Sequence, residues 1–342
     1  MNIPSFYELD SAGFGKKCGT MFKPDCDIAT VGGREFGRQN NIKASSHKGS
    51  DPWVVLAIID AQVDFCNPTW GNLYVDGAEH DIDRLCKFIF RNPATISRIV
   101  ASLDTHYLYQ PFHRFNWVAG PNPAQRQNGT HYSEGEPPDP FTIITLANLT
   151  EGKWLPSRMP NRMRQMLEKL EQGGKKQLCI WPLHCELGTP GQALEPALIE
   201  AMHWHAGARS DQYDLTPKGM SQSAEHYGIL RAEAQFTDDP TTQLNTPIVN
   251  EWAKADRIYF AGQAKSHCVL ETLEQVVDIF SKKSPEVLDR LYVLQDCMSS
   301  VPDIKDADGN VIVPFNQIAE GRFTEFKKMG LKFVNSTDPI TI

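Results

Sequence analysis

The stretch IYFAGQAKSHCVLET at residues 258–272 joins a short apolar run to a helical pattern through a single glycine. Residues 258–261 are typical of a buried strand, which ends at Gly262. Beyond this turn, apolar residues recur at the 3.6-residue spacing of a helix with one buried face, at Val269, Leu270, Leu273, Val276, Val277 and Phe280. A strand that runs directly into a helix is the building unit of a parallel α/β sheet. This stretch therefore indicates an α/β fold.

Cys268 lies where this strand turns into the helix. Backbone N–H groups and the positive end of the helix dipole favour an anion at such a position. A thiol there can lose its proton near neutral pH and act as a nucleophile. The alternative is a small buried core residue, because free cysteine is among the most buried residue types.

The rest of the chain repeats the alternation of strands and helices. Further strands are predicted at 53–59, 97–103, 178–181, 213–216, 290–295 and 332–335, with a strand-like piece at 141–146. Helices are predicted at 80–90, 162–172, 196–205 and 323–329. This order predicts a doubly wound, mostly parallel sheet with helices on both faces.

Two segments stand outside this pattern. Residues 1–50 lack sustained periodicity, and we interpret them as a partly irregular N-terminal extension to one domain spanning 51–342. The polar, proline-rich segment at about 118–160 is interpreted as an insertion. We expect it to shape the mouth of a pocket or to form an oligomer contact.

Composition and charge exclude several classes of protein. The net charge is −8, with lysine and arginine scattered along the chain, so neither nucleic acid nor an anionic membrane is expected as a partner. No apolar run reaches the length of a membrane span, and the first residues lack the pattern of a secretory signal. The eight cysteines include no CxxC pair, which is typical of reduced thiols in a chain this long. We expect a cytoplasmic, globular protein that forms a homo-oligomer.

Polar side chains follow three of the predicted strands. Asp60 ends the first strand, Asp104 and His106 follow the second, and His184 follows the strand at 178–181. Open α/β sheets bind ligands at the carboxyl ends of their strands. Carboxylate oxygen and imidazole nitrogen suit Zn²⁺ or a similar divalent ion, and three protein ligands leave positions open for a substrate. Each of these residues could instead be a loop cap or an ordinary polar loop residue.

Other polar residues have simpler interpretations. His203 and His205 compete as metal ligands, but they lie two apart in a helical stretch, where side chains diverge, so we interpret them as surface and core groups. Asp64 is interpreted as a loop cap or an ion-pair partner. Lys218 follows the strand at 213–216. Most lysines lie on the surface, yet this one could join the Asp and Cys side chains at the sheet edge in a charge-balanced cluster.

Five motifs occur in the order seen in one enzyme family. They are DAQVDF at 60–65, DTH at 104–106, WPLHC at 181–185, PKG with EHYGIL at 217–230, and GQAKSHCV at 262–269. With these motifs the chain resembles the nicotinamidases, which belong to the isochorismatase-like cysteine hydrolases. The resemblance spans about residues 54–300 and implies the six-stranded isochorismatase-like hydrolase fold.

The resemblance implies a catalytic triad of Asp60, Lys218 and Cys268. In that arrangement Asp60 takes the thiol proton, Lys218 stabilises the charges, and the thiolate attacks a carboxamide carbon. Backbone N–H groups of Ala264 and Cys268 would meet the oxyanion. Water then hydrolyses the thioester. The expected reaction converts nicotinamide to nicotinate and ammonia, a step of NAD salvage.

The resemblance also implies a metal ion, usually zinc, bound by Asp104, His106 and His184, where it would orient the ring nitrogen of the substrate. The peptide bond between Gln263 and Ala264 is expected to be cis. Phe65, Trp117 and Tyr227 are expected to pack against a flat ring of the substrate. Gln263 is also expected to contact the substrate.

Other functions remain open from the sequence. A related cysteine amidohydrolase for carbamoyl or ureido compounds is disfavoured, because such relatives generally lack the Asp/His/His metal set. A catalytically silent binding protein of the same fold is disfavoured, because every triad position is filled. The branch that acts on vinyl ethers lacks the cysteine and the metal residues, so their presence favours an amidase. A variant mechanism would use zinc to activate water and leave Cys268 as a bystander.

Overall fold

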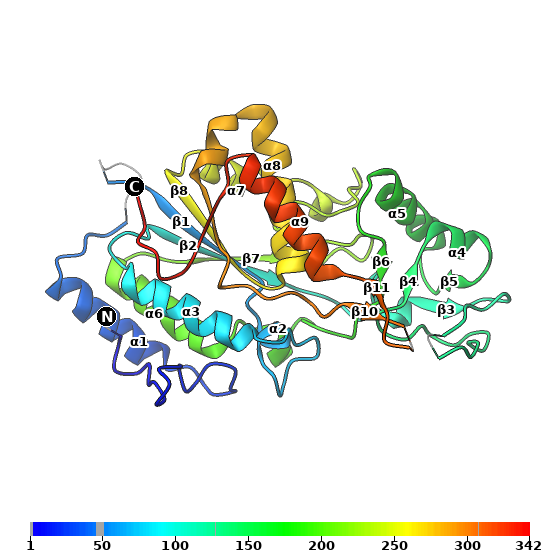
Figure 1. Ribbon diagram of the computed structural model, residues 1–342, viewed down its shortest axis with the longest axis horizontal. Helices are drawn as coiled ribbons and strands as arrows, with labels where there is room; N and C mark the ends of the chain where they lie inside the picture. Colours follow the sequence, from blue (N-terminus) through cyan, green and yellow to red (C-terminus); the bar gives the residue numbers. More distant parts are fainter. Residues whose placement is uncertain (1–2, 46–50, 127, 307) are drawn as a thin grey trace.

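Six parallel strands form the central sheet of the computed structural model, which describes residues 3–45, 51–126, 128–306 and 308–342 (Figure 1). The strand order is β12-β9-β8-β1-β2-β7, and every neighbouring pair is parallel. The strands are β1 (Val54–Ile59), β2 (Arg98–Asp104), β7 (Asp214–Lys218), β8 (Arg257–Gly262), β9 (Leu291–Leu294) and β12 (Lys332–Val334). The predicted α/β class and six-stranded sheet are confirmed, and the sheet is wholly parallel.

Helices cover both faces of this sheet, as the doubly wound pattern predicts (Figure 1). One face carries α3 (Ala78–Arg91) and α6 (Pro196–Arg209), and the other carries α7 (Thr246–Trp252), α8 (Leu270–Lys283) and α9 (Phe315–Lys328). All six residues of β1 are buried, because β1 lies in the middle of the sheet between these layers. Among the described residues, no helix is both long enough and apolar enough to cross a bilayer.

Small elements lie beyond the end of the central sheet, on the right of Figure 1. They are β3 (Trp117–Ala119) with β5 (Trp154–Pro156), β4 (Ile143–Ile144) with β6 (Leu178–Cys179), β10 (Ile304–Lys305) with β11 (Val311–Val313), and the helices α4 (Leu146–Thr150) and α5 (Pro160–Gln172). The short α2 (Val63–Cys66) follows β1. Most of the segment at 118–160 therefore forms structure outside the central sheet.

Two predicted strands differ from the structure. The piece at 141–146 is a strand only at Ile143–Ile144, because Thr145 and Asn148 form a capping box that starts α4 instead. The strand at 178–181 is shortened to β6, and it pairs antiparallel with β4 rather than joining the central sheet. Both pieces have the apolar, β-branched composition of strands, which does not specify the sheet they join.

The N-terminal extension contains a helix that sequence periodicity does not indicate. This helix, α1 (Cys26–Gln39), packs against α6 through a face of small residues, Ala29, Gly33 and Gly37. A Cβ atom on Gly33 would lie 2.0 Å from the carbonyl oxygen of Trp204, so the two backbones approach more closely than any other residue allows. A helix face built from glycine and alanine produces almost no hydrophobic periodicity, so the sequence pattern does not predict α1.

This contact makes a matched pair of glycine substitutions informative. We expect Gly33→Ala to lower the free energy of unfolding by about 1–3 kcal/mol, because the added methyl group forces the two helices apart. In Gly32→Ala the new methyl group would make an ordinary contact 3.7 Å from the Trp204 ring, so the higher helix propensity of alanine should leave the free energy of unfolding unchanged or raise it by up to about 1 kcal/mol. Urea denaturation of the two variants measures both effects, and equal losses would contradict this account of the contact.

Candidate active site

The ends of four neighbouring strands bring the predicted catalytic groups together. In the sheet order β8-β1-β2-β7, Asp60 directly follows β1, Asp104 ends β2 and Lys218 ends β7. Asp104 and Lys218 are register partners across β2 and β7. Cys268 follows β8 in the turn that leads into α8. The carboxyl ends of parallel strands meet at one edge of a sheet, so residues far apart in the chain share this edge.

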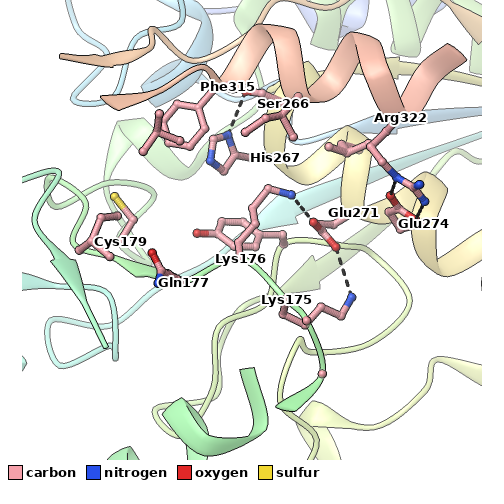
Figure 2. A pocket seen from close by; sticks show the side chains of 17 residues that line it. Lys175, Lys176, Gln177, Cys179, Ser266, His267, Glu271, Glu274, Phe315 and Arg322 are labelled. Carbon is pink, nitrogen blue, oxygen red and sulfur yellow. Dashed lines mark hydrogen bonds and ion pairs between the residues drawn. The ribbon is translucent and has the colours of Figure 1, made fainter. Parts of the chain in front are cut away.

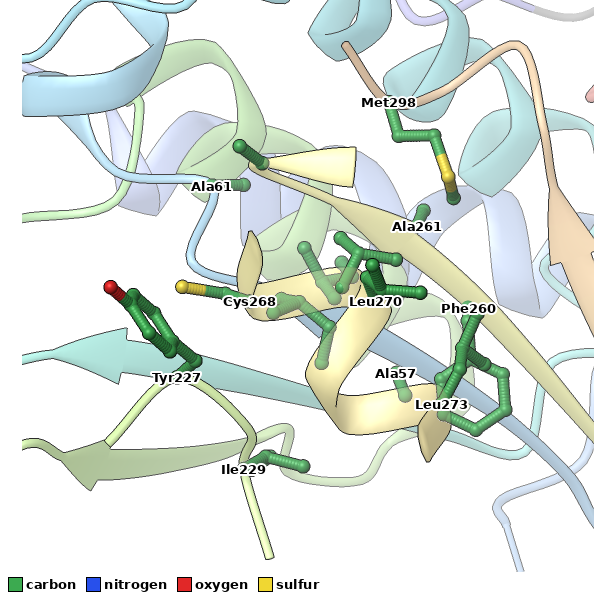
Figure 3. Packing of buried hydrophobic residues seen from close by; sticks show 14 of the residues in the cluster. Ala57, Ala61, Tyr227, Ile229, Phe260, Ala261, Cys268, Leu270, Leu273 and Met298 are labelled. Atoms are coloured by element: carbon green, nitrogen blue, oxygen red, sulfur yellow. The ribbon is translucent and has the colours of Figure 1, made fainter. Parts of the chain in front are cut away.

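Cys268 projects from a π-helical turn, Lys265–Val269, just before α8. Figure 3 shows its sulfur pointing toward the ring of Tyr227, while Leu270 and Leu273 pack on the other side. The peptide bond between Gln263 and Ala264 is cis, as the resemblance implies. We expected the pKa of this thiol to be lowered toward neutral pH. Instead, burial raises the pKa of Cys268, and the Asp60 and Asp104 carboxylates add to the rise, although Lys218 opposes it. The resting group is therefore a thiol, which needs a base.

The Lys218 ammonium occupies the centre of the cluster. Its side chain is 1 % exposed, and its Nζ atom lies 2.9 Å from Oδ2 of Asp60 and 2.9 Å from Oδ1 of Asp104. The same Nζ atom donates to the carbonyl oxygen of His226 at 3.1 Å and lies 3.8 Å from Sγ of Cys268. Burial alone would lower the pKa of Lys218, but the two carboxylates raise it well above its usual range. A positive charge is thus held between both carboxylates and the thiol.

Asp60 has an environment suited to a base. Three atoms lie within 4.8 Å of one another: a carboxylate oxygen of Asp60, a carboxylate oxygen of Asp104 and the sulfur of Cys268. Ser102 donates its hydroxyl to Oδ1 of Asp60 at 2.6 Å. Burial raises the pKa of Asp60, while Lys218 pulls it down. Its backbone is left-handed, with φ +44°, a conformation that aspartate tolerates better than most residues.

Asp104, His106 and His184 form a second cluster that could hold a metal ion. Their ligand atoms all lie within 4.8 Å of one another. Nε2 of His106 lies 2.9 Å, and Nε2 of His184 3.8 Å, from Oδ2 of Asp104. The other ring nitrogen of each histidine contacts a backbone carbonyl oxygen, at 3.2 Å for His106 to Gly219 and 2.8 Å for His184 to Pro182. Such contacts fix a ring so that its Nε2 atom faces a metal.

The donor set fits a divalent ion. Nε2 of His106 is buried and makes no aligned hydrogen bond to a described residue. Burial and the adjacent His106 hold the pKa of His184 well below its usual range, so its ring is neutral, the form that binds metals. Burial would raise the pKa of Asp104, but His106 and Lys218 outweigh it and keep the carboxylate charged. One carboxylate and two imidazoles match the ligand types of an open zinc site.

The route that brings His184 to this cluster differs from the predicted one. His184 does not leave a strand of the central sheet, because β6 belongs to the small side sheet. Its loop is held by Asp64, whose Oδ2 atom accepts the backbone N–H of Cys185 at 2.6 Å. The carbonyl oxygen of Cys185 in turn accepts the N–H of His106 at 3.0 Å. Of the two roles predicted for Asp64, loop cap or ion-pair partner, the structure shows the loop cap.

Gln62 of the DAQVDF motif holds the end of β2, which carries Asp104. Its Oε1 atom accepts the N–H of Asp104 at 2.8 Å, and its Nε2 atom donates to the carbonyl oxygen of Asp104 at 2.7 Å. The same Nε2 atom also donates to the carbonyl oxygen of Gln192 at 2.7 Å. The DAQVDF motif thus fixes the backbones on both sides of the cluster.

A small cavity lies beside both clusters, and its walls are largely aromatic. It is lined by Phe65, Leu73, Asp104, His106, Phe112, Trp181, His184, Glu225, Tyr227, Ala264, His267, Cys268 and Val301. Phe65 and Tyr227 were expected here. Trp117 is instead fully buried in the core, where its ring N–H donates to the carbonyl oxygen of Pro111. Gln263 directs its side chain to Asp81 and to the N–H of Ser299, away from the cavity.

Sequence reasoning did not select several of the lining residues. Trp181 belongs to the WPLHC motif and donates its ring N–H to the Tyr227 hydroxyl at 3.1 Å, which holds two walls together. Glu225 precedes Tyr227 by two residues, and His267 precedes the thiol. Proximity to a recognised motif was the available signal for all three. By contrast, Lys265 turns toward α9, where it pairs with Glu320.

The competing histidines lie away from the cluster. Nε2 of His205 contacts the carbonyl oxygen of Ile96 at 3.0 Å inside the core. His203 is half-buried, and its two ring nitrogens contact the hydroxyl groups of Thr30 and Tyr213. The interpretation of both as structural groups agrees with these contacts.

A larger cavity of about 500 Å³ adjoins the first one, and Tyr227 and His267 line both. Figure 2 shows its charged side chains engaged with one another: Lys175 and Lys176 both contact Glu271, and Arg322 contacts Glu274. Each of the three cations of this outer cavity is therefore already paired with a carboxylate.

Comparison with known proteins gives similarity only at the level of structure. No protein-family model matches the chain, and no curated protein matches it significantly. A structure of the yeast nicotinamidase bound to the inhibitor nicotinaldehyde has a TM-score of 0.52 at 17% identity, covering 82% of this chain and 99% of the yeast chain. A second structure of the yeast nicotinamidase gives the same values. The Acinetobacter baumanii nicotinamidase has a TM-score of 0.49 at 18% identity, covering 85% and 99%. The chain thus has the α/β fold of the yeast nicotinamidase.

Proposed function

We propose that this protein is a metal-dependent cysteine amidohydrolase that converts nicotinamide, or a closely similar heteroaromatic carboxamide, to the carboxylic acid and ammonia. One observation carries the proposal: Asp60, Lys218 and Cys268 converge beside the Asp104/His106/His184 set at one small cavity. A nucleophile with an adjacent base is the arrangement that acyl transfer requires. The aromatic walls of the cavity suit a flat ring.

The first half of the proposed reaction forms a thioester. Asp60 takes the proton of the Cys268 thiol, and the sulfur attacks the carboxamide carbon. Backbone N–H groups of Ala264 and Cys268 stabilise the oxyanion, and Lys218 balances the negative charge nearby. When the oxyanion collapses, the C–N bond breaks and Asp60 returns its proton to the leaving nitrogen, which departs as ammonia.

The second half releases the acid. Asp60 takes a proton from a water molecule, and the water oxygen attacks the thioester carbon. The C–S bond then breaks, and Asp60 returns the proton to the leaving sulfur, which restores the thiol. Asp104, His106 and His184 would hold the divalent ion, zinc being the natural candidate, which supplies a Lewis-acidic partner for the ring nitrogen. Phe65 and Tyr227, which line the cavity, would pack against the faces of the substrate ring and so orient it.

The substrate is tested by ammonia release. We expect purified wild-type protein to release ammonia from nicotinamide, and to act much more slowly on benzamide, which lacks the ring nitrogen. The measurement is kcat/KM for both amides in a coupled ammonia assay, with metal content determined on the same sample. Turnover of neither amide by protein that contains one metal ion per chain would contradict the proposal.

The nucleophile is tested by substitution of the thiol. We expect Cys268→Ala to lower kcat by roughly 10³-fold or more while leaving the metal content unchanged, because no other group can form the thioester. A free cysteine outside the cavity provides the control: Cys26→Ala should keep wild-type kcat. If Cys268→Ala retains most of the activity, a metal-activated water is the nucleophile instead.

The metal set is tested by metal content. We expect His184→Ala to lower the bound metal from about one per chain to a small fraction, because two ligands bind a divalent ion far more weakly than three. His203→Ala, which changes a histidine bonded to Thr30 and Tyr213, should keep the metal. Elemental analysis after dialysis measures both variants. Equal metal content in the two would place the ion elsewhere.

A further inference from the structure

Ser102 makes two hydrogen bonds to Asp60, and the proposed reaction gives them no role. The serine is fully buried on β2, beside the end of β1. Its hydroxyl oxygen accepts the backbone N–H of Asp60 at 3.0 Å, and the same hydroxyl donates to Oδ1 of Asp60 at 2.6 Å. A serine hydroxyl has only one proton to donate. Because the N–H of Asp60 already points at the hydroxyl oxygen, that proton is directed to the carboxylate.

The two oxygens of the Asp60 carboxylate therefore have different surroundings. Oδ1 is engaged by Ser102, whereas Oδ2 is buried and makes no aligned hydrogen bond with any residue that the structure describes. Oδ2 instead lies 2.9 Å from the Lys218 ammonium nitrogen, which is itself 3.8 Å from the sulfur of Cys268. Oδ2 and the thiol thus face the same cation. A buried oxygen without a hydrogen bond calls for an explanation, and acceptance of the thiol proton supplies one.

The bonds from Ser102 fix the direction of the carboxylate. One hydroxyl holds both the backbone and Oδ1 of Asp60, so the side chain cannot turn without breaking the shorter of the two bonds. Hydrogen bonds to a charged carboxylate are among the strong ones in proteins. Without Ser102, the carboxylate could rotate to bring both oxygens to the Lys218 ammonium, and neither oxygen would then be reserved for the thiol.

We propose that Ser102 is a positioning residue that reserves Oδ2 of Asp60 for the proton of Cys268. In the first half of the reaction the proton passes from the sulfur to Oδ2 as the C–S bond forms. It passes from Oδ2 to the departing nitrogen when the C–N bond breaks. Ser102 donates to Oδ1 throughout, so the proton stays on the oxygen that faces the reacting atoms. This inference rests on the proposed amidohydrolase function and adds a residue to it.

The first variant, Ser102→Ala, removes the hydroxyl. We expect kcat for nicotinamide to fall by about 10- to 100-fold while KM stays within about twofold of the wild-type value, because the base is misplaced and the cavity walls are not. A second readout needs no amide turnover. Iodoacetamide alkylates Cys268 when the sulfur displaces iodide and Asp60 takes the thiol proton. The rate of this reaction, followed by mass spectrometry on the peptide that contains Cys268, should fall by a similar factor.

A conservative variant tests whether the hydroxyl itself is required. Ser102→Thr keeps a hydroxyl at the same position, so both kcat and the alkylation rate should stay within about threefold of the wild-type values. If Ser102→Ala does not fold, Ser102→Cys takes its place. Its thiol is a weaker donor of similar size, so we expect losses between those of the threonine variant and the wide range given for alanine. Wild-type rates in Ser102→Cys would then overturn the inference.

The matched control is Ser97, at the other end of the same pair of strands. Its hydroxyl accepts the N–H of Val54 and donates to the carbonyl oxygen of Pro52, each at 3.1 Å. Ser97→Ala therefore removes the same kind of link between β1 and β2, but far along both strands from the thiol. It should lower the melting temperature and leave kcat and the alkylation rate at their wild-type values.

The outcomes separate a positioning role from a structural one. Wild-type rates in Ser102→Ala, or equal losses of rate in Ser102→Ala and Ser97→Ala, overturn the inference and leave the proposed function intact. Failure of the wild-type protein to hydrolyse any amide overturns the proposed function instead. The alkylation rates then still show whether Ser102 controls the reactivity of Cys268, and an alkylation rate no faster in the wild-type protein than in Ser102→Ala overturns the inference as well.

Discussion

A single buried ammonium group determines the arrangement of everything around it. Lys218 is almost completely withdrawn from solvent, and its Nζ atom lies 2.9 Å from each of two carboxylates that are themselves buried. Two carboxylates so close together repel each other, and the cation between them makes their proximity tolerable. Removing one partner of such a buried group typically costs about 3–5 kcal/mol, because the remaining charge is left without compensation. Asp60 lies beside the Cys268 thiol, and Asp104 lies beside His106 and His184. Because Lys218 contacts both carboxylates, it connects the Cys268 cluster to the histidine cluster.

The hexapeptide after β1 shows how the backbone supports this charge cluster. Asp60 contributes a carboxylate that contacts Lys218, and Gln62 holds Asp104 through both of its backbone groups. Asp64 holds the loop that carries His184, and Phe65 forms a wall of the cavity. Asp60 and Phe65 therefore face the site directly, whereas Gln62 and Asp64 support it. The geometry of Asp104, His106 and His184 thus depends on hydrogen bonds made by side chains that belong to neither cluster.

The sequence predicts the fold and the edge of the sheet more reliably than the directions of individual side chains. Asp60 and Asp104 each end an apolar run, and Lys218 ends a short strand-like segment. Parallel strands bring such ends together, so their meeting follows from the strand pattern and the topology. Trp117 and Gln263 lie close in sequence to residues of the site, yet one ring is in the core and the other side chain turns toward α3. Distance along the chain does not specify which way a side chain points. The raised pKa of Cys268 likewise depends on burial and on two carboxylates from distant strands, which no local pattern reveals.

The glycine-lined contact between α1 and α6 bears on where the folded unit begins. α6 is buried on nearly all sides, with the sheet layer on one side and α1 on the other, and Trp204 packs against both Phe36 and Phe90. The sequence pattern alone would place the start of the α/β domain at residue 51. A chain cut there would lose α1 and turn the backbone groove of α6, together with the Trp204 ring, into an exposed apolar surface. The N-terminal segment thus covers a surface of α6 that would otherwise face solvent, and the packed unit extends beyond the central sheet and the helices that flank it.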